Sequence, residues 1–275
     1  MTLASGVRSG YVVPVSPETV ALNHYTSGDP DAPAVFLGAS LGTTLSMWDS
    51  LADHLAHRYH VVRFDTRGHG SSPVPPGPYT MRALAADVVA LADELEIRRF
   101  AYVGLSLGGA IGLTLAVEHG DRLTSLVLCC TAAKFGDPFT WLDRGARVRD
   151  EGMRWLVDAT RERWFTPEFL REHPREADDV LRMLGDTAPQ GYAACCDALA
   201  AYDLSDRLGE VRTPTRLILA AQDPVTPPET ARPLVEGIAG ADEVVIDGAA
   251  HIANIARPDR FNAAVAEHLD RTVQE

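Results

Sequence analysis

The chain has 275 residues, of which 46% are hydrophobic and 23% are charged. This composition is typical of a soluble globular protein, and the length is sufficient for one large α/β domain with a sizeable core. The formal net charge of −13 argues against a nucleic-acid partner, because phosphate binding requires a clustered basic surface. The same charge disfavours anionic substrates, so an anionic substrate would require a local cation.

The first thirty residues do not resemble a signal peptide, and no apolar run approaches the roughly 20 residues needed to cross a bilayer. We therefore expect a cytoplasmic protein without a membrane partner.

The four cysteines form two adjacent pairs, Cys129-Cys130 and Cys195-Cys196. Neither pair has the spacing of a zinc site, and neighbouring residues do not readily form a disulfide. We interpret these cysteines as small buried apolar residues.

Short apolar runs alternate with amphipathic stretches along most of the chain. The apolar runs are rich in Val, Ile and Leu without polar alternation, as in strands that are buried on both faces. An N-terminal edge hairpin is predicted first, at 11–15 and 20–25, followed by strands at 34–38, 61–64, 100–104, 125–130, 215–220 and 243–246. Helices are predicted at 47–57, 81–95, 107–119, 229–238 and 258–269. This alternation predicts an α/β fold with a mostly parallel central sheet flanked by helices.

Between about residues 133 and 208 the strand pattern is interrupted. The segment has a helical pattern with several prolines, and it contains Trp141, Trp155 and Trp164. We interpret it as a helical cap inserted over the carboxyl edge of the sheet, where open α/β sheets bind ligands. The predicted division is therefore a core of residues 1–132 and 209–275 and a cap of residues 133–208. We expect the cap to shape a pocket, the alternative being a cap that only packs against the core.

A nucleophile motif lies between the third predicted strand of the sheet and the helix that follows it. Residues 100–110 read FAYVGLSLGGA, which places G-x-S-x-G in the strand–turn–helix context that the motif requires. Side chains at Gly104 or Gly108 would collide with the neighbouring strand and helix in so sharp a turn. The segment also resembles a dinucleotide-binding G-x-G-x-x-G, but Ser106 occupies its middle position and would block a pyrophosphate. We therefore predict Ser106 as a nucleophile.

A serine hydroxyl needs a base to become a nucleophile. In α/β folds that carry a G-x-S-x-G turn between a strand and a helix, the order along the chain is serine, acid, histidine. His251 follows the last predicted strand in a loop expected at the carboxyl edge, so we predict it as the base. His173, in the cap, and His268, near the end of the terminal helix, are less suitable. The predicted acid is Asp223, which follows the strand at 215–220, with Asp203 as the alternative.

Two backbone N–H groups are predicted to stabilise the oxyanion. Leu107 begins the helix after the nucleophile, and Leu41 lies in the loop GASLG at 38–42. The histidines and carboxylates show no metal-ligand spacing, so we expect neither a metal nor an organic cofactor. The glycine-rich segment from Asp65 to Gly70, DTRGHG, is interpreted as a structural turn rather than as part of the site.

Taken together, these motifs resemble those of 3-oxoadipate enol-lactonases, which are α/β-hydrolases. The resemblance runs from about residue 20 to the end of the chain. The segments that carry it are SLGT and MWD within 40–49, FDTRGHGSSPVPPGPYT (64–80), VGLSLGG (103–109), GYAACC (191–196), DPVTPP (223–228) and HIANI (251–255).

The resemblance implies hydrolysis of 3-oxoadipate enol-lactone to 3-oxoadipate in aromatic catabolism, with a small-molecule lactone as the binding partner. It assigns the triad to Ser106, Asp223 and His251. It also implies that Lys134 takes the place of a usual arginine near the substrate carboxylate and that Trp141 lines the pocket. A lysine offers a point charge where arginine offers a two-pronged donor.

A second departure from the family pattern is Ala39, which stands where relatives usually carry Asn or His.

The alternative functions are a general carboxylesterase or cofactor-free perhydrolase with the same triad and, from another class, a ligand-binding receptor with vestigial catalysis. The sequence does not determine the oligomeric state.

Overall fold

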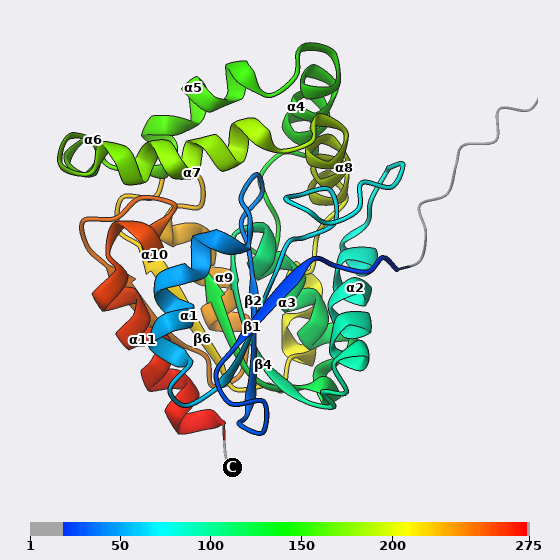
Figure 1. The fold of residues 1–275 in the computed structure, drawn as a ribbon, viewed down its shortest axis with the longest axis vertical. Helices are drawn as coiled ribbons and strands as arrows, with labels where there is room; N and C mark the ends of the chain where they lie inside the picture. Colours follow the sequence, from blue (N-terminus) through cyan, green and yellow to red (C-terminus); the bar gives the residue numbers. More distant parts are fainter. Residues whose placement is uncertain (1–18, 274–275) are drawn as a thin grey trace, which may run out of the picture.

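Within residues 19–273, the part of the chain that this computed structural model describes, one seven-stranded sheet forms the centre of the molecule (Figure 1). The strand order is β1-β3-β2-β4-β5-β6-β7. The strands are β1 (His24–Ser27), β2 (Ala34–Gly38), β3 (His60–Phe64), β4 (Phe100–Leu105), β5 (Leu123–Cys129), β6 (Thr215–Ala220) and β7 (Asp242–Ile246). All neighbouring pairs are parallel except β1 and β3. The predicted mostly parallel sheet is therefore confirmed.

The predicted N-terminal hairpin is only partly represented. Its first arm, 11–15, lies outside the described residues, and its second arm was expected at 20–25. The observed edge strand β1 begins later, at His24, and pairs antiparallel with β3. Side chains bind the preceding backbone donors: the Val20 N–H donates to Asp87 and the Asn23 N–H donates to Ser72 Oγ. These bonds replace the ladder that a longer strand would have formed.

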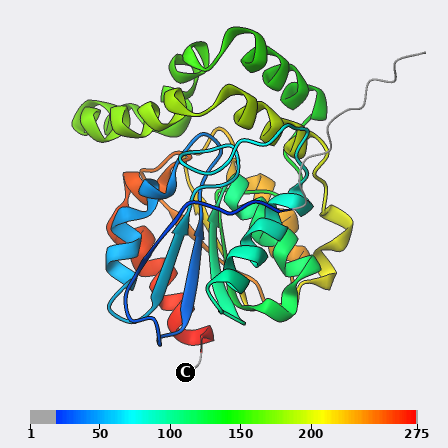
Figure 2. The same ribbon diagram turned by 45° about the vertical axis from the view of Figure 1, so that its right-hand side comes forward.

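Helices cover both faces of the sheet, as predicted (Figure 2). On one face lie α2 (Met81–Glu94) and α3 (Leu107–Glu118), and on the other lie α1 (Asp49–Leu55) and α11 (Pro258–Thr272). The short helices α9 (Arg232–Gly237) and α10 (Ala253–Ala256) complete the core, with 3₁₀ turns at Leu45–Trp48, Gly120–Arg122, Ser205–Glu210 and Pro228–Ala231. Residues of α3 are buried on all sides through Ala116, because this helix lies between the sheet and α2.

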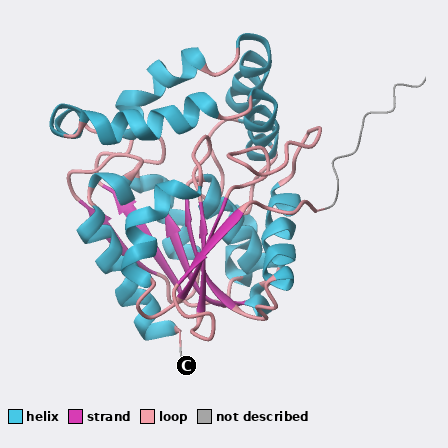
Figure 3. Cartoon of the chain, viewed as in Figure 1, coloured by secondary structure: helices cyan, strands magenta, loops and turns pink. Residues whose placement is uncertain are grey.

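Five helices lie between β5 and β6 in the chain and above the carboxyl edge of the sheet (Figure 3). They are α4 (Pro138–Glu151), α5 (Arg154–Trp164), α6 (Pro167–Glu172), α7 (Pro174–Asp186) and α8 (Pro189–Ala200). Four of them begin with proline, which suits the first helical position because its missing N–H would be unpaired there. The strict division into core and cap at residues 133 and 208 remains a prediction.

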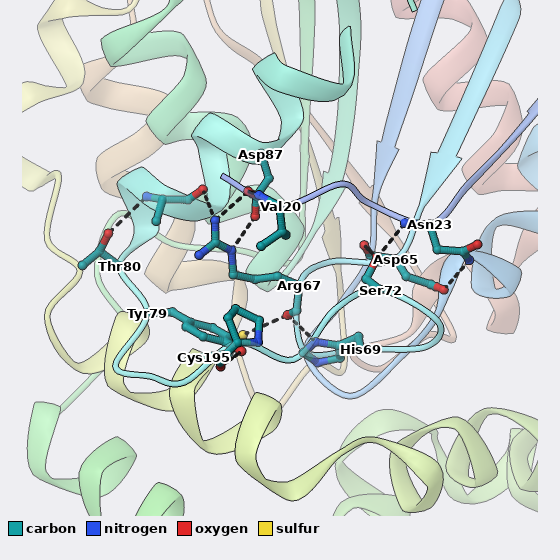
Figure 4. A network of polar contacts seen from close by, with 12 residues as sticks. Val20, Asn23, Asp65, Arg67, His69, Ser72, Tyr79, Thr80, Asp87 and Cys195 are labelled. Carbon is teal, nitrogen blue, oxygen red and sulfur yellow. Dashed lines mark hydrogen bonds and ion pairs between the residues drawn. The ribbon is translucent and has the colours of Figure 1, made fainter. Parts of the chain in front are cut away.

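A buried ion pair joins the turn after β3 to α2 (Figure 4). Arg67 Nε lies 2.5 Å from Asp87 Oδ2, and Arg67 Nη2 lies 2.6 Å from Asp87 Oδ1. Both side chains are almost fully buried, at 0% and 1% exposed. The Val20 N–H donates to the same carboxylate, so the ion pair also fixes the chain just before β1. Removing one partner of such a pair takes away the opposite charge that offsets the desolvation of the other, which is strongly destabilising.

We therefore expect Asp87→Asn to lower the free energy of unfolding by about 3–5 kcal/mol, measured by urea denaturation. The matched control is Asp93→Asn on the same helix, because Asp93 forms an exposed ion pair with Arg122. This control should cost no more than about 1 kcal/mol. Equal effects of the two substitutions would contradict the structural role given to the buried pair.

Candidate active site

Ser106 occupies the sharp turn between β4 and α3. Its backbone has φ 57° and ψ −112°, a region that non-glycine residues rarely adopt and that is strained. Such strain is typical of a nucleophile at the top of an α/β sheet. The Ser106 N–H donates to the carbonyl of Cys129 at the end of β5 (2.9 Å), and Thr131 Oγ1 donates to the Ser106 carbonyl (2.8 Å). The end of β5 and the segment that follows it therefore hold the turn through both its N–H and its carbonyl.

Glycines around this turn allow three backbones to come together. A Cβ atom at Gly104 would overlap the carbonyl oxygen of Gly108, and one at Gly108 would overlap the carbonyl oxygen of Gly38. The steric reason predicted for the two motif glycines is thus confirmed. Gly38 ends β2, so its contact brings the loop after β2 next to the N-terminus of α3.

The predicted acid and base are in direct contact. His251 Nδ1 lies 2.8 Å from Asp223 Oδ2, and both residues are buried. Asp223 Oδ1 accepts from the N–H groups of Val225 and Thr226, and Oδ2 accepts from Thr226 Oγ1. A ring proton on Nδ1 leaves Nε2 of His251 as an acceptor, which is the form that a general base requires.

Two opposing effects act on the Asp223 carboxyl. Burial favours its neutral form, but the charge and hydrogen bond of His251 and the bonds from Thr226 and Val225 outweigh burial and lower its pKa. Asp223 is therefore poised to remain ionised opposite the imidazole, where it can stabilise a positive ring.

The alternative acid and the other candidate histidines lie elsewhere. Asp203 forms an exposed ion pair with Lys134 at 2.8 Å, and that contact lowers the pKa of Asp203 to about 2. His173 stacks on Phe169 in the cap, at 4.9 Å between ring centroids. His268 Nε2 lies 3.3 Å from the Pro214 carbonyl in the core. Of the candidate pairs, the structure brings together Asp223 and His251.

The three candidate residues of the triad follow strands of one parallel set. Ser106 follows β4, Asp223 follows β6 and His251 follows β7, so all three lie at the carboxyl edge of the sheet. The cap contacts this edge directly, because the Ile252 N–H donates to the Trp164 carbonyl at the end of α5 (3.2 Å). Of the predicted oxyanion donors, Leu107 is the first residue of α3, and Leu41 lies in the loop after β2. Their roles remain predictions.

A cavity of about 250 Å³ lies between the cap and the loop after β6. Thr226, which donates a hydrogen bond to the Asp223 carboxylate, forms part of its wall, so the cavity adjoins the Asp223–His251 pair. Lys134 and Trp141, the predicted substrate-binding residues, are both in the wall. The remaining lining residues are Ala132, Phe135, Gly136, Asp137, Thr140, Arg144, Arg163, Val225 and Thr230.

Two half-buried arginines of this cavity were not predicted from the sequence. Arg144 lies on α4 with its guanidinium 4.5 Å from the centre of the Trp141 ring, and Arg163 lies on α5. Burial, reinforced by the positive charge of Arg144, lowers the pKa of Arg163. Among residues 19–273, no carboxylate lies within 4.0 Å of either guanidinium. The one available sequence signal was the i,i+3 spacing of Trp141 and Arg144.

Neither a metal site nor a membrane span emerges from the described part of the chain. Among residues 19–273, no three His, Cys, Asp or Glu side chains are grouped so that they could hold a metal ion. No helix in the same range is long and apolar enough to cross a bilayer.

Comparison with known proteins places this geometry in a family. The family model described as alpha/beta hydrolase family matches residues 34–264. The chain is 38% identical to 3-oxoadipate enol-lactonase 2 of Acinetobacter baylyi, over 92% of this chain and 95% of that protein. The crystal structure of the enol-lactonase from Burkholderia xenovorans is similar, with a TM-score of 0.88 and 39% identity over 90% of this chain and 96% of that one.

A thermophilic esterase from Thermogutta terrifontis, solved with malate bound, has a TM-score of 0.88 at 29% identity, over 92% of this chain and 94% of that one. The α/β-hydrolase fold predicted from the sequence is confirmed, and so is the resemblance to enol-lactonases. The chain therefore belongs to the alpha/beta hydrolase family, and it is a hydrolase.

Proposed function

We propose that the chain is a serine hydrolase that opens 3-oxoadipate enol-lactone to 3-oxoadipate. The main support is the buried Asp223–His251 pair at the same sheet edge as the strained Ser106. The similarity to 3-oxoadipate enol-lactonases supports the choice of substrate. The aromatic-catabolic pathway and the cytoplasmic location expected from the sequence belong to the same proposal.

In the proposed mechanism, His251 Nε2 takes the proton of Ser106, and the serine oxygen attacks the lactone carbonyl. The N–H groups of Leu107 and Leu41 stabilise the tetrahedral oxyanion. Collapse of this intermediate breaks the ring C–O bond while protonated His251 gives its proton to the ring oxygen, so the leaving group is an enol that relaxes to the ketone. Water then hydrolyses the acyl-enzyme, with His251 again as the base.

The cations of the cavity support a substrate that carries a carboxylate. Because the chain has a net charge of −13, a local positive site must offset the overall field. Arg144 and Arg163 provide two guanidinium groups that no carboxylate of the described chain approaches within ion-pair distance. Arginine binds carboxylates with two parallel hydrogen bonds, so these groups suit the free carboxylate of the lactone.

Lys134 is a third cation at the cavity in this proposal, and Trp141 forms part of its apolar wall. The Lys134 ammonium is exposed and already pairs with Asp203, so a substrate carboxylate would compete with that contact. We therefore assign the larger share of carboxylate binding to the two arginines.

A general carboxylesterase is the second candidate function. The observation that favours it is the similarity to the Thermogutta terrifontis esterase at 29% identity. An esterase would use the same triad, so the substrate preference, rather than the nucleophile, separates the two proposals.

We expect Ser106→Ala to lower lactone turnover by at least about 10⁴-fold, as removal of a nucleophilic serine does in other triads. The assay is hydrolysis of freshly generated enol-lactone, with urea denaturation to establish that the variant is folded. Ser50→Ala, which changes an exposed serine of α1, should retain wild-type turnover. Turnover by folded Ser106→Ala close to that of the wild type would rule out the nucleophile.

We expect Arg163→Gln and Arg144→Gln each to raise the KM for the enol-lactone by about 10- to 100-fold, the value of a charge-assisted hydrogen bond. The KM for a neutral aryl acetate should change little, because that ester has no carboxylate. Lys134→Ala is the comparison variant and should have a smaller effect, since Asp203 already occupies its ammonium. Equal changes for both substrates would remove the arginines from the carboxylate site.

A further inference from the structure

A buried histidine in the turn after β3 contacts the loop that follows β2. His69 is 1% exposed. The Gly42 N–H donates to His69 Nε2 at 2.9 Å. On the other side of the ring, His69 Nδ1 lies 3.3 Å from the Arg67 carbonyl oxygen (Figure 4). The sequence pattern had indicated only a glycine-rich turn here, because composition does not show where a ring points.

The two contacts determine which ring nitrogen carries the proton. A backbone N–H can only donate, so Nε2 must accept, and a carbonyl oxygen can only accept, so Nδ1 must carry the proton. Burial lowers the pKa of His69 to about 4, which keeps the ring neutral near pH 7. The neutral ring is therefore a fixed connection between the Arg67 carbonyl and the Gly42 N–H.

The loop at 39–44 is held at two places by the turn that contains His69. His69 binds the Gly42 N–H, and Asp65 Oδ1 accepts from the Leu45 N–H at 2.8 Å. The first of these points lies within a tight turn at 40–43, in which the Thr43 N–H and the Thr43 hydroxyl both donate to the Ser40 carbonyl. The Leu41–Gly42 peptide lies in this turn, so fixing the Gly42 N–H restricts rotation about Leu41.

The support behind His69 is itself rigid. Its partner, the Arg67 carbonyl, belongs to the residue whose side chain forms the buried ion pair with Asp87. On the cap side, Gly68 packs so closely on Gly191 of α8 that a Cβ at either position would overlap the other. The ring of His69 is thus held between a fixed turn and the loop that it contacts.

We propose that His69 is a positioning residue of the oxyanion hole, which holds the Leu41–Gly42 peptide so that the Leu41 N–H points at the substrate carbonyl oxygen. This inference rests on the proposed function, because it needs a tetrahedral oxyanion formed by attack of Ser106. It gives the glycine-rich turn a role in the transition state, and it predicts an effect on kcat rather than on KM.

Two substitutions separate the hydrogen bond to Gly42 from the rest of the side chain. In His69→Asn the amide is at the level of Nδ1, so it can still donate to Arg67 but is too short to reach Gly42. In His69→Gln the terminal oxygen is near the level of Nε2 and can accept from the Gly42 N–H. Removal of one oxyanion donor typically lowers kcat by about 10²–10³-fold, and a misaligned donor should lower kcat by less. We therefore expect kcat of His69→Asn to fall by about 10- to 100-fold.

The KM of His69→Asn should stay within about threefold of the wild-type value. The kcat of His69→Gln should stay within about fivefold of the wild-type value, because glutamine restores the acceptor for the Gly42 N–H. The assays use both the enol-lactone and an aryl acetate, whose kcat values should fall by the same factor. His57→Asn is the matched control, because His57 is exposed, and it should leave kcat unchanged. Urea denaturation separates loss of stability, which both His69 variants should share, from loss of kcat.

An unchanged kcat in folded His69→Asn, or an equal loss of kcat in the Asn and Gln variants, would overturn the proposal. Should His69→Asn fail to fold, His69→Met replaces it, because methionine fills the space of the ring but is only a weak acceptor. Failure of the proposed function gives a different result. A wild type that hydrolyses the aryl acetate but not the lactone fails as a lactonase, and the His69 comparison is then decided on the ester. A fully active Ser106→Ala overturns both proposals.

Discussion

The close approach of three backbones around Ser106 is the constraint on which the site depends. β2, β4 and the start of α3 meet where Gly38, Gly104 and Gly108 lack side chains, and the Tyr102 hydroxyl fills the remaining space while donating to the Gly108 carbonyl. The strained serine backbone persists because these contacts allow few alternatives. The same packing brings the loop after β2 beside the helix N-terminus, so one steric arrangement serves both the proposed nucleophile and the proposed oxyanion donors.

Charge is distributed unevenly around this arrangement. The chain carries an excess of carboxylates, yet the carboxylate at the reacting edge, Asp223, is buried and occupied by His251, Thr226 and two backbone N–H groups. The nearby cavity instead presents guanidinium groups from α4 and α5. In our interpretation the core therefore supplies the chemistry and the cap supplies the charge that selects the substrate. A change of cap residues could then alter the substrate while the triad stays the same.

The sheet and the contact between Asp223 and His251 were predictable because their physical signals are local. Strands buried on both faces must be apolar runs, and the elbow requires glycines at fixed spacing around a serine. Strand ends were less predictable: β5 begins at Leu123, before the predicted start, and ends before Cys130, whose φ of 43° turns the chain. The cavity arginines were missed because Arg144 lies in a stretch of mixed charge, where sequence alone does not separate an inward guanidinium from a solvated one.

The turn after β3 shows why a structural interpretation and a functional one need not compete. Its glycines and the buried Arg67–Asp87 pair are what a structural turn requires, and the sequence indicated such a turn. A rigid turn nevertheless determines the position of whatever it touches, and here it touches the loop after β2 through Asp65 and His69. A transition-state donor is effective only when its direction is fixed before the charge develops. Rigidity far from the reacting atoms is therefore part of the catalytic arrangement that we propose.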